Sequence, residues 1–122
     1  MTELLAFQSP PLKAGEMMGT KVTNSQGESL GEIKELVIDP HGGRVAYVVV
    51  SFGALFGMGE KLFAIPFAAF AYDAAKNHYI LYVPKQRLED APGFDHHHWP
   101  SMADEQWNRD LHDYYKHPPY WE

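Results

Sequence analysis

The sequence predicts an all-β fold of five or six short strands, arranged as a small antiparallel barrel or sandwich and followed by an amphipathic helix. Residues 44–52 are mostly β-branched or aromatic, which favours a pleated strand over a helix. Other short apolar runs alternate with turn residues at close spacing, and no strand–helix–strand rhythm is visible. The C-terminal stretch carries large side chains at helical spacing.

The run from Val45 to Phe52 organises this prediction because it is apolar on both faces. A strand with one solvated face alternates, so this strand should be covered on both sides. The barrel interior can cover one face, and the helix, the C-terminal tail or a second subunit must cover the other. A glycine-rich loop at 53–59 leads to a returning strand at 60–66, which should end at Pro66 because proline has no N–H for the ladder.

The other elements are shorter. Residues 1–15 are expected to form a loose arm, since Ser9-Pro10-Pro11 interrupts any regular element. A short strand is predicted at 21–23 and the last strand at 78–83. The stretch 84–94 has room for one helical turn.

The strand predicted at 30–39 should contain a bend. Its apolar residue Ile33 lies on one face, whereas Leu36 and Ile38 fall on the other. A strict period of two cannot bury all three, so we expect a bulge near Lys34-Glu35. The following Asp39-Pro-His-Gly-Gly43 is a hairpin turn.

Residues 95–122 differ in composition from the rest of the chain. They contain all three Trp and five of the seven His, and they hold −4 of the net charge of −6. Ser101 followed by Asp104 resembles a capping box, and Pro118-Pro119 should end the helix. The predicted buried face of this helix consists of Ala103, Trp107, Leu111 and Tyr114.

Composition bounds the class of protein. A chain of 122 residues suffices for one domain, and the absence of cysteine excludes disulfides, thiolate zinc sites and Cys nucleophiles. The acidic isoelectric point of about 5.6 disfavours nucleic acid as a partner. The longest uncharged run, 45–59, is shorter than the roughly 20 apolar residues of a membrane span, and no signal segment is visible. We therefore expect a soluble, cytoplasmic protein.

A family resemblance rests on the stretch GTKVTNSQGESLGEIKELVIDPHGGRVAYVVVSFGALFGMGEKLFAIPFAAF and on YVPKQRLEDAPGF after it. Its marks include the Gly27…Leu30-Gly31 turn, Gly43-Arg44, and Gly59-Glu60-Lys61 leading to Ile65-Pro66. Over about residues 16–94 the chain resembles the PRC-barrel family. That family includes the cytoplasmic domain of the photosynthetic reaction-centre H subunit and the C-terminal domain of ribosome maturation factors. The closing LEDAPGF looks like the stand-alone bacterial branch.

The resemblance implies a small six-stranded antiparallel β-barrel that acts as a protein-interaction module, with no catalytic residues. It divides the chain into an N-terminal arm (1–15), a barrel domain (16–94) and a helical extension (95–122). The H subunit has a membrane-spanning helix before its barrel, and the ribosome factors have a separate N-terminal domain. We expect neither specific role to transfer to this chain.

The candidate metal ligands are His96, His98 and His112. Neutral imidazoles bind Zn, Ni or Cu, and in an extended segment the first two of these side chains point the same way. Asp95 or Asp113 could complete such a site. The alternative is a solvated linker, because consecutive histidines lack the spacing of known sites. No other cofactor is expected.

The loop at 53–59 does not match a phosphate-binding loop, because a strand follows it rather than a helix. Its apolar residues Leu55, Phe56 and Met58 either form an exposed patch that meets a partner or plug the end of the barrel. The sequence leaves both readings open.

Catalysis has little support in the sequence. The carboxylates Glu32, Glu35 and Asp39 are expected on the solvent face of their strand rather than as an acid–base pair. The serines lie in no nucleophile-elbow motif. We therefore expect the chain not to be an enzyme.

The predicted function is that of a non-enzymatic interaction or adaptor module that works as a homodimer in a larger assembly. Trp107, Leu111 and Tyr114 should pack on the barrel or across the dimer, and with the three loop residues above they are the candidate partner-binding residues. The alternative function is a sensor of a metal or small ligand that uses the His-rich segment.

Overall fold

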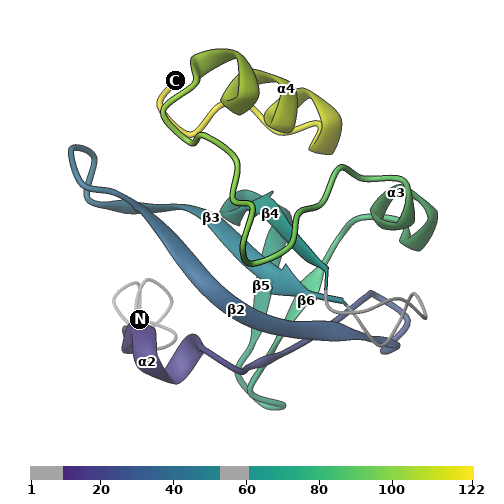
Figure 1. Cartoon of the computed structure of the whole chain (residues 1–122). Helices are drawn as coiled ribbons and strands as arrows, with labels where there is room; N and C mark the ends of the chain where they lie inside the picture. Colours follow the sequence, from purple (N-terminus) through teal and green to yellow (C-terminus); the bar gives the residue numbers. More distant parts are fainter. Residues whose placement is uncertain (1–9, 53–60) are drawn as a thin grey trace.

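Six strands form one curled sheet in the computed structural model, which describes residues 10–52 and 61–122 (Figure 1). The strands are β1 (Lys21–Thr23), β2 (Ser29–Asp39), β3 (Arg44–Ser51), β4 (Leu62–Pro66), β5 (Phe70–Asp73) and β6 (His78–Leu81). Their order across the sheet is β4-β3-β2-β1-β6-β5. Strands β4 and β5 therefore stand at the two ends of the order, and the curled sheet is a half-barrel.

The prediction of six strands is confirmed, but the prediction that all of them are antiparallel is wrong. The pairs β1–β2, β2–β3, β3–β4 and β5–β6 are antiparallel, whereas β1 and β6 pair in parallel, with Val22 opposite Tyr79. Turn residues constrain only strands that follow one another along the chain. The direction of β1 relative to β6 is set by the path of the whole sheet, which no local pattern encodes.

The bend predicted in β2 is confirmed. The register between β2 and β3 shifts between Ile33 and Glu35, where the bulge was expected, and shifts again between Val37 and Ile38. The two irregularities bend this long strand around the core. Ile33 is 1% exposed, whereas Ile38 at the far end is 53% exposed.

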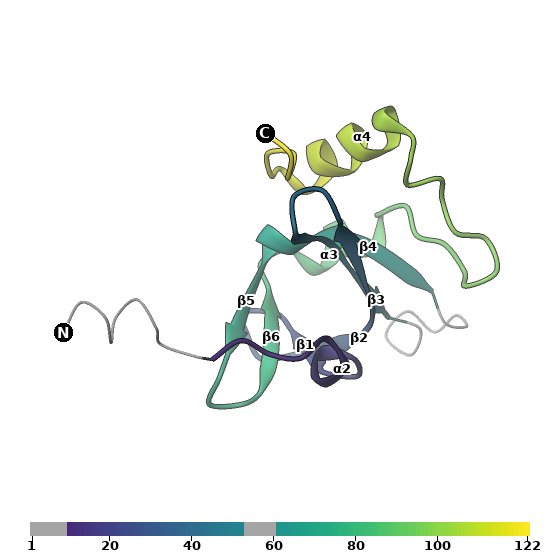
Figure 2. The same ribbon diagram turned by 90° about the vertical axis from the view of Figure 1, so that its left-hand side faces the viewer.

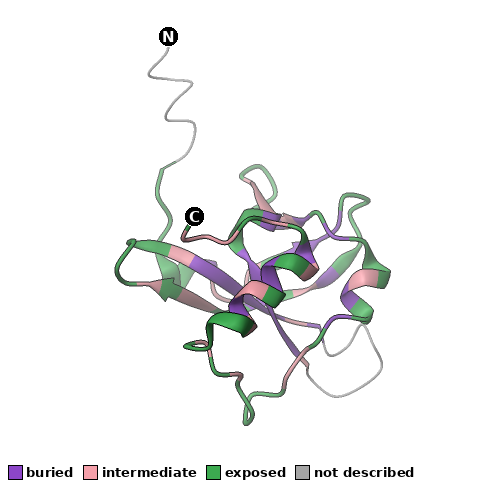
Figure 3. Cartoon of the chain, turned by 90° about the horizontal axis from the view of Figure 1, so that it is seen from above, coloured by how far each residue is buried: buried purple, intermediate pink, exposed green. Residues whose placement is uncertain are grey.

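Strand β3 is the centre of the core. Each residue from Ala46 to Val50 is at most 3% exposed, and Phe52 just after the strand is buried as well (Figure 3). The prediction that both faces of this strand are covered is confirmed. The first turn of the chain after β2 also forms as expected, with the N–H of Gly43 donating to the carbonyl of Asp39 at 2.9 Å.

Four short helical segments complete the described part, so the structure is mostly β rather than all-β. They are α2 (Ala14–Met17), the 3₁₀ turn η2 (Phe67–Ala69), α3 (Lys85–Glu89) and α4 (Glu105–Tyr115). In Figures 1 and 2, α4 lies above the sheet and α2 below it. No helix within residues 10–52 and 61–122 is long and apolar enough to cross a membrane.

The boundaries of α4 correct the sequence prediction. The N-cap is Asp104, whose carboxylate accepts from the N–H groups of Gln106 and Trp107, and not Ser101. Ala103 therefore precedes the helix and is exposed, so it does not belong to the buried face. The helix ends where Lys116 takes a left-handed conformation (φ 59°).

Candidate interaction surfaces

The outer face of β3 and β4 is covered by α4 and by the residues that follow it (Figure 1). Leu111 of α4 is 6% exposed. The ring of Tyr47 on β3 meets Trp107 edge-on at 5.7 Å between centroids, and meets Tyr120 in the same way at 5.6 Å. One copy of the chain thus covers the face that the sequence left without a partner. The homodimer prediction loses its main argument.

A buried amide fixes α4 on the sheet. The hydroxyl of Tyr47 donates to Oδ1 of Asn108. The Nδ2 of Asn108 donates to the carbonyls of Met102 and Asp104 at 3.0 and 2.8 Å. Every polar atom of this amide is paired, so it sets one register of the helix against β3. Burial, and after it the neighbouring Tyr120, raises the pKa of Tyr47, so its hydroxyl keeps the proton that it donates.

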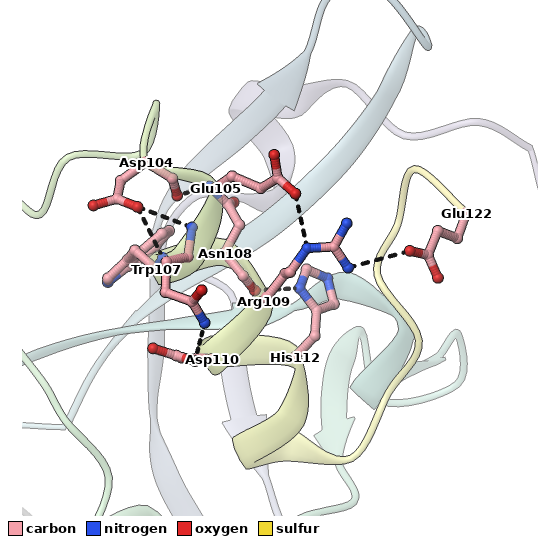
Figure 4. Close-up of polar contacts among 9 residues, drawn as sticks. Asp104, Glu105, Trp107, Asn108, Arg109, Asp110, His112 and Glu122 are labelled. Carbon is pink, nitrogen blue, oxygen red and sulfur yellow. Dashed lines mark hydrogen bonds and ion pairs between the residues drawn. The ribbon is translucent and has the colours of Figure 1, made fainter.

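His112 is buried beside this amide, one turn further along α4 (Figure 4). Its Nδ1 lies 2.7 Å from the carbonyl of Asn108, which can only accept, so Nδ1 carries a proton. Its ring packs on Tyr47, Tyr120 and Trp121 at 5.4 to 5.7 Å between centroids. Within the described residues, Nε2 of His112 has no hydrogen-bond partner. The imidazole therefore serves as a packed aromatic group here.

Helices α3 and α4 hold each other by a reciprocal contact. The guanidinium of Arg87 donates to the carbonyl of Tyr114 through Nε at 2.9 Å and Nη2 at 2.7 Å, and the hydroxyl of Tyr114 donates to the carbonyl of Arg87 at 2.6 Å. The guanidinium also lies 4.6 Å from the centre of the Tyr114 ring. This contact joins the end of the barrel to the tail.

Glu122 at the end of the chain is held to the middle of α4 by Arg109. Arg109 donates to Glu105 at 2.8 Å and to Glu122 at 3.3 Å (Figure 4). Its guanidinium also stacks over Trp121 at 5.5 Å. Exposed ion pairs contribute little to stability, so these contacts mainly orient the C-terminal residues.

The predicted partner-binding residues fall into two groups. Trp107, Leu111 and Tyr114 pack within the chain, which is the intramolecular reading that the sequence allowed. The loop residues Leu55, Phe56 and Met58 lie outside the described part of the structure, so the choice between plug and partner patch stays a prediction.

The histidine run is exposed and separate from His112. His98 Nδ1 lies 2.8 Å from Oδ1 of Asp95, and the rings of His96 and His97 are tilted by 40° with 3.9 Å between centroids. The His98 imidazole, and after it the N–H of His97, hold the pKa of Asp95 below its usual value. Across residues 10–52 and 61–122, no group of three or more His, Cys, Asp or Glu side chains is placed to hold a metal ion. The structure does not bring the predicted ligands together.

A small pocket nevertheless brings together a predicted metal ligand and two predicted partner-binding residues. Its volume is about 260 Å³, and it lies between α4 and the segment before it. Its walls include His98, Trp107 and Leu111. The side chains around it are mostly apolar, and only the imidazole of His98 can titrate or bind an ion.

The strand carboxylates take the predicted solvent-facing places at Glu32 and Glu35 but not at Asp39, whose side chain is only 14% exposed. Glu32 and Glu35 are exposed on β2. Asp39 pairs with Arg44 across the hairpin at 3.1 Å. The N–H of Gly42, and after it the Arg44 side chain, lower the pKa of Asp39. This carboxylate stabilises the turn, and among residues 10–52 and 61–122 its ion-pair partner is Arg44 rather than a second acid.

An apolar groove of about 400 Å³ was not predicted from the sequence. It lies between η2, β5, β6 and the start of β3, and all of its side chains are uncharged. Its lining includes Met17, Val45, Phe67, Phe70, Tyr72 and Tyr79. The signal that could have revealed it is the spacing of Phe70 and Tyr72, which places two aromatic rings on one face of β5.

The family model described as PRC-barrel domain matches residues 12–88, which is more than half of the chain. A search of curated proteins found no match. The matched range includes all six strands, η2 and most of α3 and leaves out α4, so the tail that covers β3 and β4 is an addition to the matched domain.

Proposed function

Because the chain belongs to the PRC-barrel family, we propose that it acts as a non-enzymatic protein-interaction module. The match over residues 12–88 carries this proposal. The polar groups of the described part support it, because their partners are structural. Asp39 pairs with Arg44 across a turn, Asp95 bonds to His98 in the histidine run, and Asn108 bonds α4 to Tyr47 on β3.

The proposed docking residues are Leu55, Phe56 and Met58. Three large apolar side chains in a glycine-rich loop have the composition of a contact patch. A single charge at the centre of such a patch should weaken binding.

The test is a binding measurement with an identified partner. The full chain captures the partner, which is then purified and titrated against the chain by calorimetry. Phe56→Asp is expected to weaken binding at least tenfold. Tyr82→Asp places the same charge at an aromatic residue that is 59% exposed elsewhere, and it should leave the affinity unchanged. Equal affinities for wild type and Phe56→Asp would remove the loop as the docking site.

The homodimer is part of the same proposal. It no longer rests on the outer face of β3, because α4 covers that face within one chain. Sedimentation of the full chain at tens of micromolar measures it directly. A dimer is expected, and a monomer at that concentration excludes it.

The alternative function as a metal sensor rests on the exposure of His96 and His98. Calorimetry with Zn²⁺ and Ni²⁺ tests it on the wild type and on His96→Ala/His98→Ala. If the site binds metal, the wild type gives binding heat and the double variant does not. His41→Ala, a change at another exposed histidine, should give the same heat as the wild type. No heat above buffer with the wild type ends this alternative.

A further inference from the structure

The groove lined by Phe70, Tyr72 and Tyr79 lies at the open side of the curled sheet. Strands β4 and β5 end the strand order and are not paired with each other. The 3₁₀ turn η2 joins them, and the groove lies between this turn, β5, β6 and the start of β3. It is therefore an accessible part of the barrel's apolar interior.

The chain itself forms one wall of the groove. Pro10, Pro11 and Leu12 belong to its lining, and they run past β5 and β6 before the chain enters α2 (Figure 2). Leu12 is 38% exposed, so this wall covers the groove only in part. The described structure begins in this wall, because its first residue, Pro10, belongs to the lining.

The preceding residues match the groove in chemistry. Residues 1–9 read MTELLAFQS, with four large apolar side chains and Glu3 as their one charged side chain. An uncharged groove suits such a segment, because no buried charge is left unpaired. Leu4 lies six positions before Pro10. At about 3.3–3.6 Å per residue this length reaches about 20 Å, enough to fold back along the groove.

We propose that this groove is the docking site of the chain's own N-terminal segment Leu4-Leu5-Ala6-Phe7. Docking there buries apolar side chains that water would otherwise surround. A groove filled in this way is unavailable to other apolar peptides. The inference is independent of the interaction role proposed above, because it concerns a different surface.

NMR on the full-length, isotope-labelled chain tests the proposal. We expect nuclear Overhauser contacts between the methyl groups of Leu4 or Leu5 and the ring protons of Tyr72 or Tyr79. The variant Leu4→Ser/Leu5→Ser/Phe7→Ser should lose these contacts and shift the resonances of the groove rings, while Asn108 at the far side keeps its shifts. The control Thr2→Ala/Gln8→Ala changes polar positions of the same segment and should leave the groove unchanged.

Two outcomes overturn the proposal. One is a wild type without these contacts whose groove resonances equal those of the triple variant. The other comes from an equal mixture of labelled and unlabelled chains. Contacts that cross between the two kinds of chain assign the groove to the segment of a second copy, whereas contacts within one chain support the proposal.

Discussion

At the scale of single residues, the polar side chains in the described part of the structure mainly fix the positions of helices and turns. Asn108 and Tyr47 show this most clearly, because each satisfies the other in a place that water does not reach. The amide fixes which turn of α4 faces β3. Apolar contacts alone would allow several registers of the helix.

Asn108→Ala should lower the free energy of unfolding by about 1–3 kcal/mol, because it leaves the buried hydroxyl of Tyr47 unpaired. In a Tyr47→Phe background the same change should cost less, since the hydroxyl is already absent. Urea unfolding of the four members of this double-mutant cycle measures the coupling. Gln106→Ala, on the exposed side of the same helix, is the control. Additive effects of the two changes would contradict the role given to the pair.

Asp39 should titrate below the ordinary value of 3.8. A carboxyl whose pKa is lowered by folding stabilises the folded state fully above its ordinary pKa, and this contribution is lost as the pH falls through the folded-state value. The hairpin should therefore weaken in acid. Carbon-13 NMR of the carboxyl measures the midpoint, and Arg44→Gln should raise it only in part because the N–H of Gly42 remains. The pKa of Asp95 should not move in that variant.

At the scale of elements, close packing of backbone decides which positions tolerate change. Gly31 on β2 lies against the carbonyl oxygen of Ser51, and it has φ +152°. The bulge of β2 and this close approach together allow the strand to bend around the core.

Gly31→Ala should lower the free energy of unfolding by more than about 2 kcal/mol, because the new methyl group overlaps a backbone oxygen that cannot rotate away. Gly15→Ala in α2 is a matched control with nothing within 4 Å of the new atom, and it should be neutral or stabilising by about 0.5–1 kcal/mol. Thermal unfolding of both variants checks the pair. Similar effects at the two positions would contradict the close approach.

The start of α4 offers a second element-scale prediction. Asp104→Ala should cost about 0.5–2 kcal/mol of stability, because two backbone N–H groups lose their acceptor. Ser101→Ala should cost little, although the sequence pattern favours Ser101 as the cap. Chemical denaturation of both variants measures the two losses of stability. A larger loss of stability for Ser101→Ala would identify Ser101 as the N-cap.

Local features of the sequence were sufficient for every strand except β5, and for the β2 bulge and the hairpin at Asp39, because each of these depends on residues close in the chain. They were insufficient for the parallel pairing of β1 with β6 and for the groove, which depend on the path of the whole sheet. The helix cap was misplaced because Ser101 and Asp104 carry the same cap chemistry three residues apart. Packing of Asn108 and Leu111 on the sheet selects between them.

At the scale of the whole molecule, the tail and the barrel form one packed unit. The matched domain ends at residue 88, yet α4 supplies part of the cover for β3 and β4, and Arg87 is bonded to Tyr114. A tail that shares its core with the barrel should not unfold alone.

Unfolding in urea should therefore give one transition. All three Trp lie in residues 95–122, so tryptophan fluorescence follows the tail, while far-ultraviolet circular dichroism follows mainly the sheet. The two signals should have coincident midpoints, as two-state unfolding requires. A fluorescence transition at lower urea would show that the tail leaves first.

The parallel pair of β1 and β6 also governs when the protein can fold. Val22 finds its neighbour Tyr79 only after most of the chain between them exists, and loop closure over such a separation is entropically costly. During synthesis β1 to β4 can begin to pair as hairpins, but β1 keeps one edge free until β6 has left the ribosome. The sheet can therefore be completed only after its last strand along the chain, β6, has been synthesised.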